Sequence, residues 1–113
     1  MSLDDRINNR ESFLVANDGQ FLGKLTFSKF DSESVFNNFG EYGNKFSSKS
    51  IYNRFGNYGN KFSSLSPYNS FTSTPPKIYL KGSFWGYLTK NQLAGSNTVD
   101  PDNLVEWLRS KNI

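Results

Sequence analysis

The chain has 113 residues, a formal net charge of +3 and aromatic side chains at 17% of its positions. This length accommodates one small domain, which we place over residues 1–113, and the abundant Phe, Tyr and Trp are expected to build its core in place of Leu and Ile. The sequence contains no cysteine or histidine. Their absence excludes disulfides, thiolate metal sites and the commonest general base.

The N-terminal residues MSLDDRINNRESF lack the apolar centre of a signal peptide. They fit a native start, an expression remnant or the start of a processed chain. No stretch approaches the roughly 18 apolar residues of a membrane-spanning helix. The first predicted element is a β-hairpin over residues 13–26, because Asn17-Asp18-Gly19 tolerates the backbone of a tight turn. Gly23, in its second strand, predicts a β-bulge or the close approach of another backbone segment.

A sixteen-residue repeat occupies residues 29–74, with two nearly complete copies between partial ones. The positions in register include Ser34/Ser50/Ser66, Asn37/Asn53/Asn69, Phe39/Phe55/Phe71, Phe30/Phe46/Phe62, Gly40/Gly56, Tyr42/Tyr58, Gly43/Gly59 and Lys45/Lys61. We expect each Ser to cap a short helical turn, each Asn to satisfy turn backbone, and Gly40 and Gly56 to close the turns in the left-handed conformation. Both Phe series are expected to lie in the core. Two complete copies are too few for an independent solenoid, so the repeat should pack on its flanks.

Two further elements follow the repeat. Residues 77–90 predict a second hairpin, similar to the first, with Gly86 in the place of Gly23. A loop at residues 97–100 then precedes a predicted helix over residues 101–110, which has Asp100 as its N-cap. The predicted fold is therefore mostly β (α+β): two hairpins form one antiparallel sheet, the repeat with its short helical turns packs against it, and one C-terminal helix docks on it.

Spaced motifs over residues 20–91 resemble those of a widespread group of uncharacterised bacterial proteins. The motifs are Leu-Gly-x-Leu at 22–25, Asp-x-(Asp/Glu)-Ser-Val at 31–35, Asn-x-(Tyr/Phe)-Gly-x-Tyr-Gly at 37–43 and 53–59, Ser-Pro-(Tyr/Trp)-Asn at 66–69 and Gly-x-Leu-Thr at 86–89. The resemblance implies no activity and no catalytic residues. Group members that look exported or lipid-anchored point to the bacterial envelope, and the cytoplasm also stays open as a location.

The candidate binding residues lie in the repeat and are Tyr42, Tyr58, Lys45, Arg54 and Lys61. A tyrosine between glycines on a polar loop offers a ring face to a sugar or a base, although packing on the neighbouring copy is the simpler interpretation. The cations make the second copy purely basic, for which a solvated face is the simpler interpretation.

Five carboxylates are the candidate acids for histidine-free glycoside hydrolysis: Asp31, Glu33, Glu41, Asp100 and Asp102. Turn and capping roles explain them, and no nucleophile motif, phosphate-binding loop or metal-ligand spacing is present. We predict a non-enzymatic binding or structural module, without metal or cofactor, that contacts protein or polysaccharide through its aromatic-glycine loops. Single-stranded nucleic-acid binding by aromatic stacking is the alternative, and a small hydrolase is the least favoured.

Overall fold

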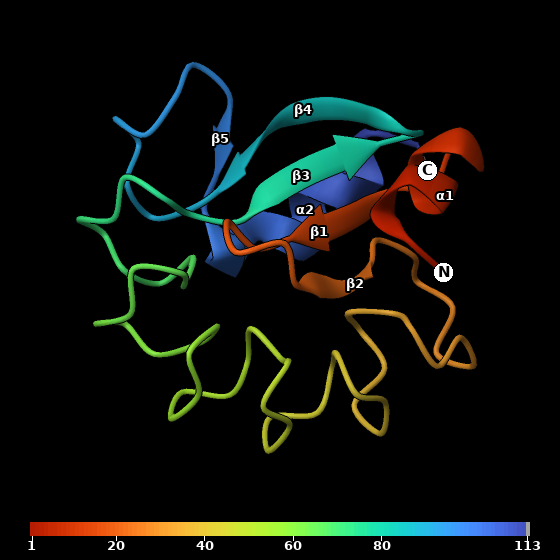
Figure 1. Ribbon diagram of the computed structural model, residues 1–113, viewed down its shortest axis with the longest axis horizontal. Coiled ribbons are helices and arrows are strands. Elements are labelled where there is room, and N and C mark those ends of the chain that lie inside the picture. The colour runs from red at the N-terminus through yellow and green to blue at the C-terminus, as the bar shows by residue number, and fades with distance from the viewer. Residues whose placement is uncertain (113) are drawn as a thin grey trace.

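A computed structural model describes residues 1–112 and contains one mixed sheet with the strand order β2-β1-β3-β4-β5 (Figure 1). The strands are β1 (Phe13–Val15), β2 (Phe21–Lys24), β3 (Lys77–Leu80), β4 (Ser83–Leu88) and β5 (Thr98–Val99). Both predicted hairpins are confirmed, and antiparallel pairing of β1 with β3 joins them. The short strand β5 pairs parallel to β4. It occupies the segment predicted to be a loop.

Two helices frame the sheet. The predicted C-terminal helix is confirmed as a 3-10 turn, η1 (Pro101–Asn103), followed by α2 (Leu104–Ser110). As predicted, the Asp100 side chain caps this element, accepting a hydrogen bond from the Asp102 N–H at 2.9 Å. Helix α1 (Leu3–Asn8) was not predicted, although a capping box between Ser2 and Asp5 opens it.

The main core is aliphatic, contrary to the expectation of an aromatic one. It lies between one face of the sheet, α2 and the repeat, and its members include Leu14, Leu22, Val35, Ile51, Ile78, Leu88, Leu104 and Leu108. A smaller cluster of Phe13, Val15 and Phe21 packs against α1 and Tyr42. Aliphatic side chains suffice because each short strand places only one or two residues on the core face.

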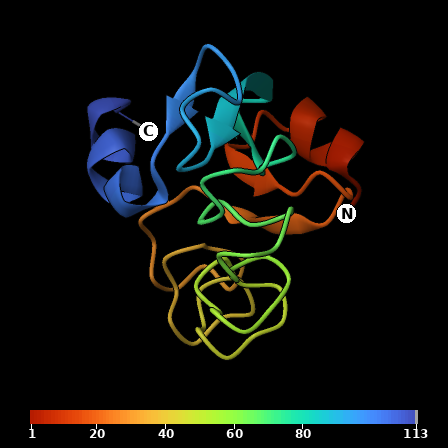
Figure 2. The same cartoon turned by 90° about the vertical axis from the view of Figure 1, so that its left-hand side faces the viewer.

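The repeat forms linked turns in place of the predicted helical turns. Backbone N–H groups bond to the carbonyl three residues earlier, as from Asn37 to Ser34 and from Gly40 to Asn37. One step of four residues, from Gly40 to Asn44, interrupts the steps of three in each unit. Four steps of three and one of four complete a coil of sixteen residues. We call 34–49 the first coil and 50–65 the second, and Figure 2 shows the linked turns as overlapping rings below the sheet.

Side chains hold each turn. As predicted for the asparagines, the Asn53 Oδ1 accepts the N–H of Phe55 at 3.0 Å, and its Nδ2 donates to the Ser47 carbonyl at 3.0 Å. The left-handed closure predicted at Gly40 and Gly56 is wrong, because positive φ among the glycines occurs at Gly19, Gly23 and Gly82. The turns close through these side-chain bonds and need no left-handed residue.

The repeat lies below strand β2 (Figure 1) and is attached to it by backbone bonds. The Lys24 N–H donates to the Glu33 carbonyl at 2.7 Å, and the Val35 N–H donates to the Lys24 carbonyl at 3.0 Å. A side chain at Gly23, whose φ is +117°, would place its Cβ 2.9 Å from the Tyr42 Cβ. The close approach predicted for this glycine is confirmed, and it accompanies a shift in the β1–β2 register.

Candidate functional site

The phenylalanines of the repeat point into solvent. Phe30, Phe39, Phe46, Phe55, Phe62 and Phe71 are between 81% and 99% exposed. The prediction that they form the core is therefore wrong. The inward apolar positions are those that directly follow the buried serines, namely Val35 after Ser34 and Ile51 after Ser50. These aliphatic residues fill the space between coil and sheet, which leaves the phenylalanines on the outside.

Six exposed phenylalanines on one short segment are unusual for a folded surface. Exposed large apolar groups occur singly on most proteins, whereas clustered ones mark interaction sites. These rings bury almost no area against the chain, so packing does not account for them. We therefore treat the outer face of the repeat as the candidate functional site.

Two equivalent hollows lie on this face. The N-terminal hollow is lined by Val35, Phe36, Asn38, Phe39, Gly43, Asn44, Lys45, Phe46 and Tyr52. The C-terminal hollow is lined by Arg54, Phe55, Gly59, Asn60, Lys61, Phe62, Tyr68, Lys90 and Asp102. Each has a volume of about 550 Å³. Seven lining positions of one recur sixteen residues later in the other, so the repeat has built the same concave surface twice.

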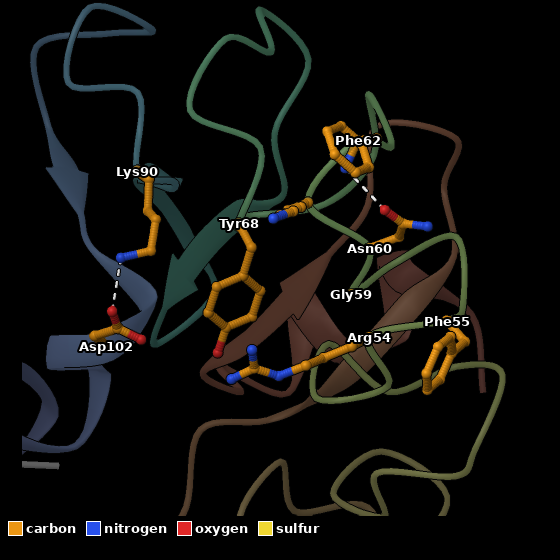
Figure 3. Close-up of a pocket in the computed structure, with 9 residues that line it drawn as sticks. Arg54, Phe55, Gly59, Asn60, Phe62, Tyr68, Lys90 and Asp102 are labelled. Atoms are coloured by element: carbon orange, nitrogen blue, oxygen red, sulfur yellow. Dashed lines mark hydrogen bonds and ion pairs between the residues drawn. The ribbon is translucent and has the colours of Figure 1, made fainter.

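The C-terminal hollow illustrates how the turns position these side chains (Figure 3). Phe55 and Phe62 come from different turns of the second coil, and the Asn60 Oδ1 fixes the Phe62 turn by accepting its N–H at 2.8 Å. At Gly59 an added Cβ would lie 2.2 Å from the Asn53 carbonyl oxygen. Only glycine allows the coil to close this tightly, so Gly59 shapes the floor between the two rings.

All three predicted cationic residues, Lys45, Arg54 and Lys61, line the hollows. The Lys45 Nζ lies 5.3 Å from the Phe46 ring centroid, and the Lys61 Nζ lies 5.2 Å from that of Phe62. Within residues 1–112 no carboxylate forms an ion pair with any of these three cations. The outer face therefore combines aromatic rings with free positive charge.

The two predicted tyrosines lie on the other side of the coils and line neither hollow. Tyr42 packs edge-on against Phe21 with ring centroids 4.9 Å apart. The Tyr58 hydroxyl donates a hydrogen bond to Asp18 in the first hairpin at 2.7 Å. Burial, together with this carboxylate, raises the pKa of Tyr58 to about 12. Both side chains attach the repeat to the first hairpin, whereas the simpler interpretation had them pack on the neighbouring copy.

The hollows are lined by Tyr52 and Tyr68 instead of Tyr42 and Tyr58. Sequence reasoning did not identify Tyr52 and Tyr68 as site residues. Each follows the buried pair that opens a new coil, so its ring reaches back to the hollow of the preceding coil. Burial raises the pKa of both hydroxyls above the ordinary tyrosine value. Both hydroxyls therefore stay protonated to a higher pH than an ordinary tyrosine. The sixteen-residue register was the signal that linked them to the hollows.

The carboxylates considered for hydrolysis all have structural partners. Glu33 binds Arg6 at 2.7 Å, Glu41 binds Lys49 at 3.0 Å, and Asp31 binds Lys24 at 3.3 Å. Asp100 and Asp102 both bind Lys90, at 3.1 and 2.6 Å. The described residues contain no group of three or more acidic side chains that could hold a metal ion.

Comparisons with protein-family models, with curated proteins and with solved structures find no match to this chain. Among residues 1–112, no helix has the length and apolar character needed to cross a membrane. The case for function therefore depends on the geometry of the outer face alone.

Proposed function

We propose that this protein is a non-catalytic binding module that holds a polysaccharide along the outer face of its repeat. The observation that carries the proposal is the pair of equivalent hollows, each bordered by two exposed phenylalanine rings. A polymer of like units suits a surface of like sites, since the second contact becomes intramolecular once the first has formed.

The chemistry of the hollows supports a sugar ligand. Binding sites for small rings are mostly apolar, with a few polar groups that fix orientation. The phenylalanine faces supply flat apolar surface for the C–H face of a pyranose. Within residues 1–112, the Asn60 Nδ2 and the Tyr68 hydroxyl form no hydrogen bond to protein, so both are free for sugar hydroxyls.

The test is affinity measurement on a panel of soluble polysaccharides, by titration calorimetry or affinity electrophoresis. Replacing both Phe55 and Phe62 with alanine should weaken binding at least about tenfold, because each ring contact contributes on the order of 1 kcal/mol. Leu93→Ser is the matched control, since Leu93 is 94% exposed and lies outside the repeat. A panel without any ligand, or full affinity in the double variant, would contradict the proposal.

A second candidate, single-stranded nucleic acid, is favoured by the free cations beside the rings, Lys45 with Phe46 and Lys61 with Phe62. Bases stack on aromatic side chains, and phosphates would bind the cations with steep salt dependence. The low net charge of +3 weighs against it. An oligonucleotide in the same panel decides between the two ligands, because a polysaccharide module should bind it more weakly than its sugar ligand.

A further inference from the structure

The two hollows differ in charge at one matched position. Asn38 in the N-terminal hollow corresponds to Arg54 in the C-terminal hollow, while the other matched pairs keep the same residue type. Lys45 is thus the single cation lining the N-terminal hollow. The C-terminal hollow is lined by Arg54, Lys61 and Lys90. The same aromatic frame therefore carries two different electrostatic fields.

The positive charge of the C-terminal hollow is only partly compensated. Asp102 is the one carboxylate among its lining residues, and it binds Lys90 at 2.6 Å. Lys90 also binds Asp100 at 3.1 Å, so the two negative charges of Asp100 and Asp102 exceed the single positive charge of Lys90. Arg54 and Lys61 belong to the second coil and form no ion pair with any residue from 1 to 112. They leave an excess of positive charge beside the two rings.

The C-terminal hollow is lined by three groups that could donate hydrogen bonds to an anion: Arg54, Lys61 and Tyr68. Figure 3 shows Arg54 extending from the coil toward Tyr68, across the hollow from the Lys90–Asp102 pair. A guanidinium presents two parallel N–H donors to a carboxylate, which gives both strength and orientation. The Tyr68 hydroxyl has no protein partner within residues 1–112 and adds a third donor.

We propose that the C-terminal hollow binds an acidic sugar residue, with its carboxylate on Arg54 and Lys61 and its ring between Phe55 and Phe62. The N-terminal hollow binds a neutral sugar of the same chain, since Asn38 offers an amide in place of the guanidinium. This inference rests on the proposed polysaccharide binding and specifies the charge of the ligand and the hollow that selects it.

Carboxylate polymers and their methyl esters provide the test, because each ester keeps the sugar backbone and removes the charge. Polygalacturonate, alginate and hyaluronate are titrated beside their esters, with an oligothymidylate as the nucleic-acid arm. We expect an acidic polymer to bind at least about tenfold more tightly than its ester, as a charge-assisted bidentate contact allows. Raised salt should reduce that ratio.

Reciprocal variants assign the preference to one hollow. Arg54→Asn reproduces the residue of the N-terminal hollow and should reduce the acid-to-ester ratio about tenfold, whereas Asn38→Arg should raise it. Both positions are exposed, so the fold should tolerate the changes. The Phe55 and Phe62 double alanine variant should weaken acidic polymer and ester alike.

The outcomes separate the inference from the proposed function. Equal binding of acid and ester, or an acid-to-ester ratio unchanged by Arg54→Asn, overturns the acidic subsite. If the double alanine variant still weakens binding to both polymers, polysaccharide binding itself stands. Binding of neither polymer, or tighter binding of the oligothymidylate, overturns both.

Discussion

The exposed position of Phe55 has a direct consequence for stability. Full burial of a phenylalanine side chain contributes about 1.5–3 kcal/mol, and Phe55 is 97% exposed. Phe55→Ala should therefore change the free energy of unfolding by only about 0.1 kcal/mol on this scale. Ile51, four residues earlier in the same coil, is fully buried. Ile51→Ala should lower the free energy of unfolding by about 2–5 kcal/mol through lost burial and the cavity left behind.

Urea denaturation measures both values in one assay. Trp85 and Trp107 lie with ring centroids 4.9 Å apart between the sheet and α2, so their fluorescence reports loss of the core. The two variants should show the same dependence on urea concentration as the parent and differ from it only in midpoint. Dilute protein is needed, because six exposed rings favour self-association at high concentration.

A loss above about 1 kcal/mol in Phe55→Ala would refute the reasoning, because an exposed ring has too little buried area to account for it. A loss that grows with protein concentration would place the ring in an interface between copies. A loss independent of concentration would place the ring inside the fold and contradict the inward position of Ile51.

Three other predictions concern the turns of the repeat and the ion pair between Arg6 of α1 and Glu33. Asn53→Ala should lower the free energy of unfolding by about 2 kcal/mol, because it removes two turn hydrogen bonds of roughly 1 kcal/mol each; urea midpoints test this. Gly59→Ala should cost more than about 2 kcal/mol by forcing backbone atoms 2.2 Å from the new Cβ to move. Gly56→Ala in the same coil, where the nearest atom is a side-chain nitrogen at 3.2 Å, should cost clearly less; thermal unfolding compares the two. Arg6 hydrogen-bonds to Glu33 and lowers the pKa of its carboxyl group. The ion pair therefore stabilises the fold above the unfolded-state pKa of about 4.3, and this contribution is lost as the pH falls through the lower folded value; Glu33→Gln should flatten that part of a stability-against-pH curve.

The hairpins could be predicted because their signals are local. Gly19 and Gly82 adopt φ values of +91° and +81° in the two turns, which is the conformation that their sequence context demands. The sixteen-residue register and the capping role of Asp100 could be predicted for the same reason. Helix α1 was within reach too, since the Ser2–Asp5 capping box is a sequence signal.

The orientation of the repeat side chains could not be predicted in this way. Strands alternate with a period of 2 and helices with one of 3.6, and these periods assign residues to faces. The coil has steps of three residues broken by one step of four, so neither period applies to it. Hydrophobicity then favoured Phe55 over Ile51 for the interior, and the structure has the reverse. The same reasoning also missed the two hollows, because they form only when the phenylalanine rings of the repeat face outward.

The hydrogen bonds that close a coil are all short in sequence, reaching no further than six residues from Asn53 or Asn69. A third unit inserted between the second coil and Ser66 would therefore close through its own hydrogen bonds, whereas its inward residue, the counterpart of the buried Ile51, would need apolar cover from the sheet side. Each such insertion would lengthen the outer face by one aromatic hollow and one lysine. Tandem duplication of sixteen codons is thus a route by which a chain of this design can lengthen the face that we propose binds polysaccharide.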